Sequence, residues 1–333
     1  MKTAAKGVSP LWEKSMTKKI AVINDLSGFG RCSLTAAVSV IAAMGVQPCP
    51  LPTAVLSAQT GYPSYFYDDY TDKMGKIQRE WEKMDVRFDG IYMGFMSGCL
   101  QIGRAIDFLD VFHREDTFLL VDPIMGDNGE RFSIFSSEFQ EEMKRLVQRA
   151  DIITPNLTEL CLLTDTDPSQ IAKNAGAAEQ EAHAHENAGA LRDGRGNDGK
   201  RIVETAEKLA RHVMQGGPSQ VVVTGIHFTD RADGREKMGN LAVTKDRAEF
   251  RAHPFIGEGY SGTGDLFASV IAGGKARGDD LAEDMKLAGE MIELAIRDAV
   301  RDGVPRNEGA EYEKYLTMLM EHRFGAPSGS GEI

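Results

Sequence analysis

Short apolar runs and amphipathic segments alternate along most of this 333-residue chain. Five runs have the length and aliphatic content of buried strands, and each ends in polar or glycine residues: 20–23, 90–94, 117–121, 151–154 and 221–225. Between them lie segments with apolar residues at helical spacing: 32–44, 73–84, 101–113, 138–149 and 202–215. This alternation predicts a three-layer αβα fold, with a mostly parallel central sheet and helices on both faces.

The pattern changes toward the predicted edges of the sheet. Residues 46–56 contain three prolines, which lack a backbone donor, so this run predicts an edge strand or an extended excursion. Residues 59–70, with four tyrosines and one phenylalanine, predict a loop. Residues 237–244 and 248–252 flank a Lys-Asp-Arg turn and predict an antiparallel hairpin at one edge.

The chain shows no domain linker, so we expect a single domain over residues 18–322, after a disordered extension at 1–17 and before a disordered tail at 323–333. Residues 165–200 are rich in small and polar residues and nearly free of large apolar ones, which predicts a flexible surface insertion. His183 and His185 lie within it. Because no further ligands are near them in sequence, a solvated loop is favoured over a metal site.

Charge and cysteine usage narrow the class of protein. The formal net charge of −12 argues against a nucleic-acid or anionic-membrane surface, because both need clustered Lys and Arg. No run approaches the roughly 20 apolar residues of a membrane span. The four cysteines form no CxxC pair, which argues against a zinc knuckle or a disulfide framework. We therefore expect reduced thiols in a cytoplasmic protein.

A glycine-rich turn near the C-terminus carries the main chemical signal. Gly262, Thr263, Gly264 and Asp265 lead directly into an apolar helix. Free backbone N–H groups and the helix dipole can hold an anion such as phosphate, and a carboxylate in the same turn can accept a proton from a hydroxyl. The alternative is structural, because Asp also stabilises the first turn of a helix.

Polar residues also stand at the ends of the predicted strands, where ligands bind in open α/β sheets. Asp122 and Asp127 lie in one tight loop, and a pair of carboxylates suits Mg²⁺ bound to substrate phosphates. Asn156 and Glu159 begin the next helix, where they form a capping-box pattern or, alternatively, Glu159 orients a magnesium-bound water. Both readings stay open, and the acids together favour metal and phosphate chemistry.

Other nucleotide and nucleophile motifs do not match. The chain has no G-x-x-x-x-G-K-[ST] sequence, so it is not a P-loop NTPase. The segment Asp25-Leu26-Ser27-Gly28-Phe29-Gly30 lacks the G-x-G-x-x-G spacing of dinucleotide-binding folds. No serine nucleophile elbow is present.

Taken in order, the motifs resemble the vitamin B6 kinases of the ribokinase superfamily. They are the Ser-Gly-x-Gly loop, Gln59-Thr60-Gly61-Tyr62, "VDPIMGD", "ADIITPNLTE", "VVVTG" and "GTGDLF". The resemblance covers residues 18–322 apart from the insertion. It implies ATP-dependent phosphorylation of the 5′-hydroxymethyl group of pyridoxal, pyridoxine or pyridoxamine, with ATP, Mg²⁺ and a monovalent cation such as K⁺ bound. It also implies a homodimer.

The resemblance further implies roles for individual residues. Asp265 matches the general base, and the N–H groups of Gly262, Thr263 and Gly264 would form the anion hole. Ser27, Thr60 and Asp265 match substrate contacts. An aromatic residue that stacks on the pyridine ring is also expected, with Phe95 as the first candidate and Tyr92 as the second. The remaining matches would bind ATP phosphates (Asp122, Thr154, Asn156, Thr224 and Gly264) or metal (Asp122, Asp127 and Glu159).

Two departures and two alternatives accompany this resemblance. The insertion is longer than the family pattern, and residues 253–261 before the turn are richer in glycine, which leaves the path of that loop open. A hydroxymethylpyrimidine kinase shares the GTGD turn, although its N-terminal loop typically follows a Gly-Ser-Asp-Ser pattern. A non-catalytic ligand-binding protein on the same fold needs no base at Asp265.

Overall fold

The computed structural model describes residues 17–168, 198–230, 233–257 and 259–321. Residues 1–16 of the predicted extension, residues 169–197 of the predicted insertion with His183 and His185, and the predicted tail at 323–333 lie outside the described residues.

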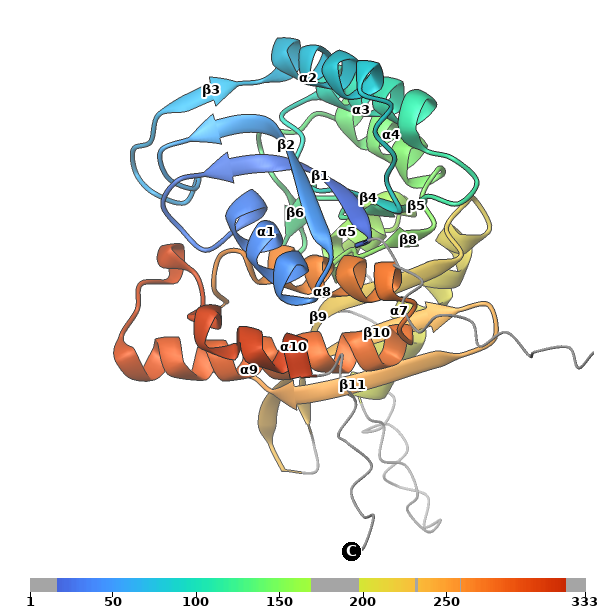
Figure 1. The fold of residues 1–333 in the computed structure, drawn as a ribbon. Coiled ribbons are helices and arrows are strands. Elements are labelled where there is room, and N and C mark those ends of the chain that lie inside the picture. Colours follow the sequence, from blue (N-terminus) through green and yellow to red (C-terminus); the bar gives the residue numbers. More distant parts are fainter. Residues whose placement is uncertain (1–16, 169–197, 231–232, 258, 322–333) are drawn as a thin grey trace, which may run out of the picture.

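A nine-stranded sheet runs through the molecule in the order β11-β10-β9-β8-β5-β4-β1-β2-β3 (Figure 1). The six strands from β2 to β9 in this order are parallel, and antiparallel strands close both edges. The strands are β1 (Lys19–Ser27), β2 (Gln47–Leu56), β3 (Tyr67–Asp69), β4 (Gly90–Met93), β5 (Phe118–Val121), β8 (Ile152–Ile153), β9 (Gln220–Asp230), β10 (Arg235–Thr244) and β11 (Ala248–Pro254).

Helices cover both faces of the sheet, as the sequence predicts. Along β1, Ile20 and Val22 face one core and Ala21 and Ile23 face the other, because successive strand residues point to opposite faces. The first core contains α1 (Ser33–Ala43), α8 (Thr263–Arg277), α9 (Leu281–Asp302) and α10 (Leu316–Glu321). The second contains α2 (Thr71–Lys83), α3 (Cys99–Phe112), α4 (Ser137–Val147), α5 (Leu157–Leu163) and α7 (Asp198–Met214).

The proline-containing run forms β2, which pairs in parallel with β1. The N–H of Gln47 donates to Lys18 O of the inner neighbour, and strand geometry then turns the nitrogens of Pro48, Pro50 and Pro52 toward the outer side. The short strand β3 pairs with Ala54–Leu56, and in the described part of the chain no strand pairs with the outer side of the prolines. The predicted edge position therefore holds for the proline half of this run, whereas β3 is the edge strand beside its second half.

Three features differ from the sequence predictions. A strand, β3, forms inside the predicted 59–70 loop, where it pairs with the outer end of β2. Strand β9 continues to Asp230, because its second half pairs with β10 rather than with β8. A small hairpin of β6 (Gly126–Asp127) and β7 (Glu130–Arg131) stands apart from the main sheet. The predicted hairpin of β10 and β11 is confirmed.

The chain ends in short helical turns beside the sheet edge that carries the ligand motifs. After α9, the 3₁₀ turns η1 (Arg306–Glu308) and η2 (Tyr312–Tyr315) lead into α10. None of the helices in the described ranges is both long and apolar enough to cross a membrane.

Candidate active site

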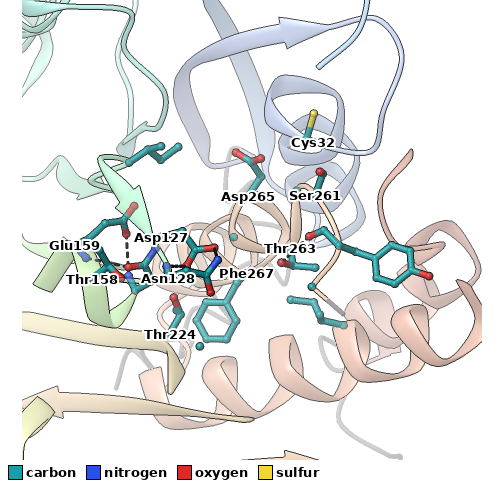
Figure 2. A pocket seen from close by; sticks show the side chains of 18 of the residues that line it. Cys32, Asp127, Asn128, Thr158, Glu159, Thr224, Ser261, Thr263, Asp265 and Phe267 are labelled. Carbon is teal, nitrogen blue, oxygen red and sulfur yellow. Dashed lines mark hydrogen bonds between the residues drawn. The ribbon is translucent and has the colours of Figure 1, made fainter. Parts of the chain in front are cut away.

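A cavity of about 960 Å³ opens at the carboxyl ends of the parallel strands, beside the start of α8. Of the fourteen predicted site residues, thirteen line it: Ser27, Thr60, Phe95, Asp122, Asp127, Thr154, Asn156, Glu159, Thr224, Gly262, Thr263, Gly264 and Asp265. Figure 2 shows Asp265, Ser261 and Thr263 on one side of this cavity, and Asp127, Asn128, Thr158 and Glu159 on the other. The fold thus brings nearly all of the predicted set together.

The glycine turn gives α8 its start. Gly262 is the N-cap, with φ of 81°, and a Cβ there would collide with the carbonyl oxygen of Arg31. Glycine is therefore required by both backbone conformation and space. A Cβ at Gly264 would meet no atom within 4 Å, and this residue is exposed to the cavity. The turn consequently directs unpaired N–H groups of the first helical turn at an open space, which suits an anion.

Asp265 lies at the third position of α8, where two donors from the other end of the chain hold its carboxylate. Asn24 Nδ2 donates to Oδ1 at 2.9 Å, and the backbone N–H of Ser33 also donates to the carboxylate. Burial raises the pKa of Asp265 to about 6, and the charge of Asp25 adds to this, while the two donors oppose it. A base with a pKa near neutrality is suited to accept a proton from a hydroxyl.

Asp122 and Thr154 follow adjacent strands, β5 and β8. Thr154 Oγ1 donates to Asp122 Oδ1 at 2.9 Å. Burial raises the pKa of Asp122 to about 7, with a further contribution from the charge of Asp265. A buried acid whose pKa is raised by burial and by a neighbouring carboxylate lies at a place where a cation is favourable.

Glu159 and Asn156 form a complete capping box at the start of α5, which confirms the structural reading of this pair. Asn156 Oδ1 accepts from Glu159 N at 2.9 Å, and Glu159 Oε2 accepts from Asn156 N at 2.8 Å. The other oxygen, Oε1, accepts from Met125 N at 3.2 Å. Burial, followed by the charge of Asp122, raises the pKa of Glu159 well above its ordinary value. A capping role and a nearby cation are therefore compatible, because the carboxylate faces the cavity.

Asp127 lies in the β6–β7 hairpin, which the sequence analysis missed. Asn128 and Gly129 form its tip, both with positive φ, as a tight hairpin turn requires. This Asn-Gly pair is a recognised hairpin signal and could have revealed it. Asp127 Oδ1 accepts from Asn128 N at 2.8 Å, and Thr158 Oγ1 accepts from Gly129 N at 2.8 Å. The hairpin therefore places an exposed carboxylate over the start of α5.

The acidic residues fit a magnesium ion shared with a substrate. In the described part of the chain, no three His, Cys, Asp or Glu side chains come close enough to enclose a metal on their own. Mg²⁺ does not need such a cage, because it is commonly bound by one or two carboxylates, waters and substrate phosphates. Buried Asp122 and Glu159, with raised pKa values, supply such carboxylates.

Tyr92 is the one predicted site residue that the fold does not bring to the cavity. It is fully buried within β4, in the core that contains α1 and α8. Phe95, two positions past the end of β4, lines the cavity, with its ring 6.2 Å from that of Phe135. Of the two aromatic candidates, the structure therefore favours Phe95 for ring stacking, and the choice of Tyr92 was wrong because its side chain points into the core.

The sequence analysis did not assign several other polar residues that line or support the site. Asp25 lines the cavity and accepts from Ser27 Oγ at 2.8 Å. Gln59 Nε2 donates to Asn307 O at 3.1 Å, and Asn307 Nδ2 donates to Gly61 O at 2.7 Å. Asn24 and Asp25 stand at the end of an apolar run, which is a signal for a ligand edge, whereas nothing in the sequence pairs Gln59 with Asn307.

The residues just before the turn, Gly259 and Ser261, contact η1. Arg306 Nε donates to Gly259 O at 2.6 Å, and Ser261 N donates to Arg306 O at 3.1 Å. The segment after α9 thus holds both the glycine turn and the Gln59–Gly61 loop.

Comparisons with known proteins agree with this arrangement. A family model described as phosphomethylpyrimidine kinase matches residues 29–195 and 187–309. A crystal structure with pyridoxal, of a Bacteroides thetaiotaomicron protein provisionally described as a phosphomethylpyrimidine kinase, is 35% identical. It has a TM-score of 0.76 and covers 91% of this chain and 96% of its own.

Two further relatives carry vitamin B6 kinase names. A pyridoxine/pyridoxal/pyridoxamine kinase of Bordetella avium is 24% identical over 281 residues, which is 80% of this chain and 81% of that protein. The pyridoxal kinase of Leishmania donovani, in complex with ADP and pyridoxamine, is 17% identical, with a TM-score of 0.70 over 91% of this chain and 95% of that one. The latter likeness concerns the fold alone.

Proposed function

Because the chain belongs to the phosphomethylpyrimidine kinase family, we propose that it transfers the γ-phosphoryl group of ATP to the 5′-hydroxymethyl group of pyridoxal, pyridoxine or pyridoxamine. The observation that carries the proposal is the placement of Asp265, with a pKa of about 6, in the glycine turn that begins α8. The Bacteroides thetaiotaomicron structure with pyridoxal supports the choice of substrate.

The hydroxyl is activated by the chain's own groups. Asp265 accepts the proton of the substrate hydroxyl as the hydroxyl oxygen attacks the γ-phosphorus, and the bond between the γ-phosphorus and the bridging oxygen of ADP breaks so that ADP leaves. The N–H groups of Gly262, Thr263 and Gly264 stabilise the charge on the transferred phosphoryl. Since phosphoryl transfer needs little covalent help from the protein, positioning and electrostatics supply most of the rate.

The opposite side of the cavity holds ATP, the phosphoryl donor. Thr154, Asn156 and Thr224 supply polar atoms for the ATP phosphates along the ends of β8 and β9. Asp122, Asp127 and Glu159 would hold magnesium, which neutralises phosphate charge when it is bound. Ser27, Thr60 and Phe95 face the same cavity from the side of β1 and β4 and would contact the pyridine ring and its substituents. A K⁺ ion, a homodimer and a cytoplasmic location stay predictions from the resemblance.

Phosphorylation of hydroxymethylpyrimidine is the second candidate, because the description of the matching family names that chemistry. The two substrates share a hydroxymethyl group on a nitrogen heterocycle, so the base and the glycine turn serve either. A non-catalytic binding protein would have no use for a base with the raised pKa of Asp265.

The experiment is a comparison of ATP consumption with four acceptors: pyridoxal, pyridoxine, pyridoxamine and hydroxymethylpyrimidine. We expect the highest kcat/KM with a B6 vitamer, and the phosphorylated product should be identified by mass. A preference for hydroxymethylpyrimidine would move the assignment to the second candidate. Binding of vitamer and ADP without turnover would favour the binding protein.

A further inference from the structure

The carboxylate of Asp265 is held by a residue from the opposite end of the chain. Asn24 lies in β1 and is fully buried, and its Nδ2 donates to Asp265 Oδ1 at 2.9 Å. A buried amide that touches the proposed base can restrict both where the carboxylate points and which protonation state it prefers.

The orientation of the Asn24 amide follows from its other contacts. Asn24 Oδ1 accepts from the backbone N–H groups of Asp25 and Phe95, both at 2.9 Å. An amide oxygen can accept both bonds, whereas an amide nitrogen can accept neither. The oxygen must therefore face the two backbone donors, which leaves Nδ2 as the group that faces Asp265.

The surroundings of Asn24 leave little freedom for another arrangement. A Cβ at Gly94, directly after β4, would lie 2.5 Å from Asn24 Nδ2, so a larger residue there would displace the Asn24 amide. The backbone N–H of Ser33, the first residue of α1, also lowers the pKa of Asp265. Ser33 has φ of 53°, in a region that residues other than glycine rarely adopt. The segments that contain Gly94 and Ser33 therefore both restrict the surroundings of the Asp265 carboxylate.

We propose that Asn24 is a positioning residue for the reaction, whose amide fixes the carboxylate of Asp265 toward the attacking hydroxyl and keeps it ionised. Because Asn24 also binds the N–H of Phe95, the same amide sets the base and the backbone of the residue proposed to stack on the substrate ring. This inference rests on the proposed function, since it needs Asp265 to act as a base.

Several titratable groups surround Asp265, so the hydrogen bond from Asn24 affects the pKa of this carboxyl. Asp25 near the end of β1 and Asp122 after β5 are carboxyls whose pKa values are themselves raised by burial, and the pKa values of Cys32 before α1 and Tyr92 in β4 are raised as well. Asn24 and the Ser33 N–H are the donors that favour the ionised form of Asp265. Because other acids lie nearby, loss of one of these two hydrogen-bond donors should raise the pKa of Asp265.

The test is Asn24→Asp, which keeps the shape of the side chain and an oxygen for both backbone donors but replaces the donor at Asp265 with an acceptor. A rise of one to two units in the pKa of Asp265 would reduce kcat at pH 7 by about two- to tenfold, because less of the base is ionised. The acid limb of the kcat profile should move to higher pH, and activity should recover toward pH 9. An unmoved limb, or an equal loss of rate at every pH, would overturn the proposal.

Gln101→Glu provides a matched control. Gln101 is also a buried amide whose nitrogen and oxygen are both hydrogen-bonded, but it does not line the cavity. Its replacement should lower thermal stability without moving the acid limb. A shift of the limb in this control would show that any buried acid has the same effect, and the specific role of Asn24 would fall.

Two further measurements separate failure of this inference from failure of the proposed function. The pKa of Asp265 can be measured without substrate by carboxyl ¹³C NMR, with Asp265→Asn used to identify the signal. This pKa should be higher in Asn24→Asp than in wild type. If Asn24→Asp folds poorly, the double variant with Asp265→Asn restores a donor–acceptor pair and should regain thermal stability. An unshifted signal, or a double variant no more stable than Asn24→Asp, would contradict the proposed contact whatever the substrate is.

Discussion

The two ends of the cavity are held together in different ways. At the end with the base, hydrogen bonds join segments far apart in sequence: Asn24 and Asp265 are separated by 241 positions, and Gln59 and Asn307 by 248. At the acidic end, the bonds join residues that are closer in sequence, such as Thr154 and Asp122, 32 positions apart, and Met125 and Glu159, 34 positions apart, and some are local. Asn156 and Glu159 are three positions apart, and Asp127 bonds to its chain neighbour.

This difference separates two kinds of function. The base end needs the complete fold before its groups meet, so its geometry depends on distant packing. The acidic end assembles within residues 122–159, from the ends of β5 and β8, the β6–β7 hairpin and the start of α5. Its main physical property is the repulsion among buried carboxylates. Substitutions at the first end should therefore change catalysis through position, and those at the second should change metal dependence and stability through charge.

The largest effect should come from removal of the base. Asp265→Asn keeps the size of the side chain but cannot accept the hydroxyl proton, so kcat should fall by about 10²–10⁴. ADP binding, measured by calorimetry, should stay close to wild type because the acidic end is untouched. Near-normal turnover in this variant would show that the base end does not supply the catalytic base.

A comparison of two glycines tests how far the base end depends on position. Gly262→Ala must place a Cβ against Arg31 O at a positive φ, so we expect a loss of about 1–3 kcal/mol in unfolding free energy. A shift of the turn by about 1 Å would reduce kcat by about 10².

Gly264→Ala is the matched variant, because a Cβ there meets no protein atom. It should melt at the wild-type temperature yet turn over more slowly, since the methyl group enters the space proposed for the phosphoryl. Equal thermal stability of the two variants would contradict the steric role of Gly262.

The contrast between the two ends also explains what the sequence could reveal. The motif "GTGD", the Asp122–Asp127 pair and the Asn156–Glu159 pair are short patterns whose geometry follows from local turns and caps, and the structure gathers all of them around one cavity. The alternating pattern likewise predicted the layered fold and the β10–β11 hairpin, because periodicity reports burial directly.

What the sequence did not reveal depends on tertiary pairing. Tyr92 was the second aromatic candidate after Phe95, and the side on which its ring lies depends on the register of β4 between β1 and β5. The contacts of Asn24 with Asp265 and of Gln59 with Asn307 cross more than two hundred positions, and no local rule predicts them. Strand β3 forms because β2 offers it an edge, which the tyrosine-rich segment alone does not indicate.

Two variants of Glu159 can separate its cap from its charge. Gln can keep the capping bond to Asn156 N, but its amide nitrogen then faces the N–H of Met125, so Glu159→Gln should lose less stability than Glu159→Ala, which should lose about 0.5–2 kcal/mol. Both should raise the Mg²⁺ concentration for half-maximal rate, by about tenfold, because both remove a carboxylate at the proposed site. A Gln variant with unchanged Mg²⁺ dependence would leave Glu159 with the capping role alone.

The smallest effect is expected from pH, and it concerns stability without nucleotide or magnesium. The pKa of Asp122 is raised to about 7 and that of Asp265 to about 6, above the value of about 3.9 in an unfolded chain. The folded state therefore binds more protons than the unfolded state between about pH 4 and pH 7, so unfolding free energy should rise as pH is lowered through this window. At about 2–4 °C per kcal/mol, a melting curve at pH 5.5 should be several degrees above that at pH 8.

Asp122→Asn tests whether the acidic end causes this dependence. Its Oδ1 can still accept from Thr154, and the charge that repels Asp265 and Glu159 is gone. This variant should melt above wild type at pH 8 and depend less on pH, while its catalytic rate with ATP and Mg²⁺ falls. Added Mg²⁺ and ADP should stabilise wild type more than the variant, because a cation relieves the repulsion only where both charges are present. If wild type and Asp122→Asn have parallel melting profiles, the acids at this end do not strain the fold, and the charge-based half of the comparison fails.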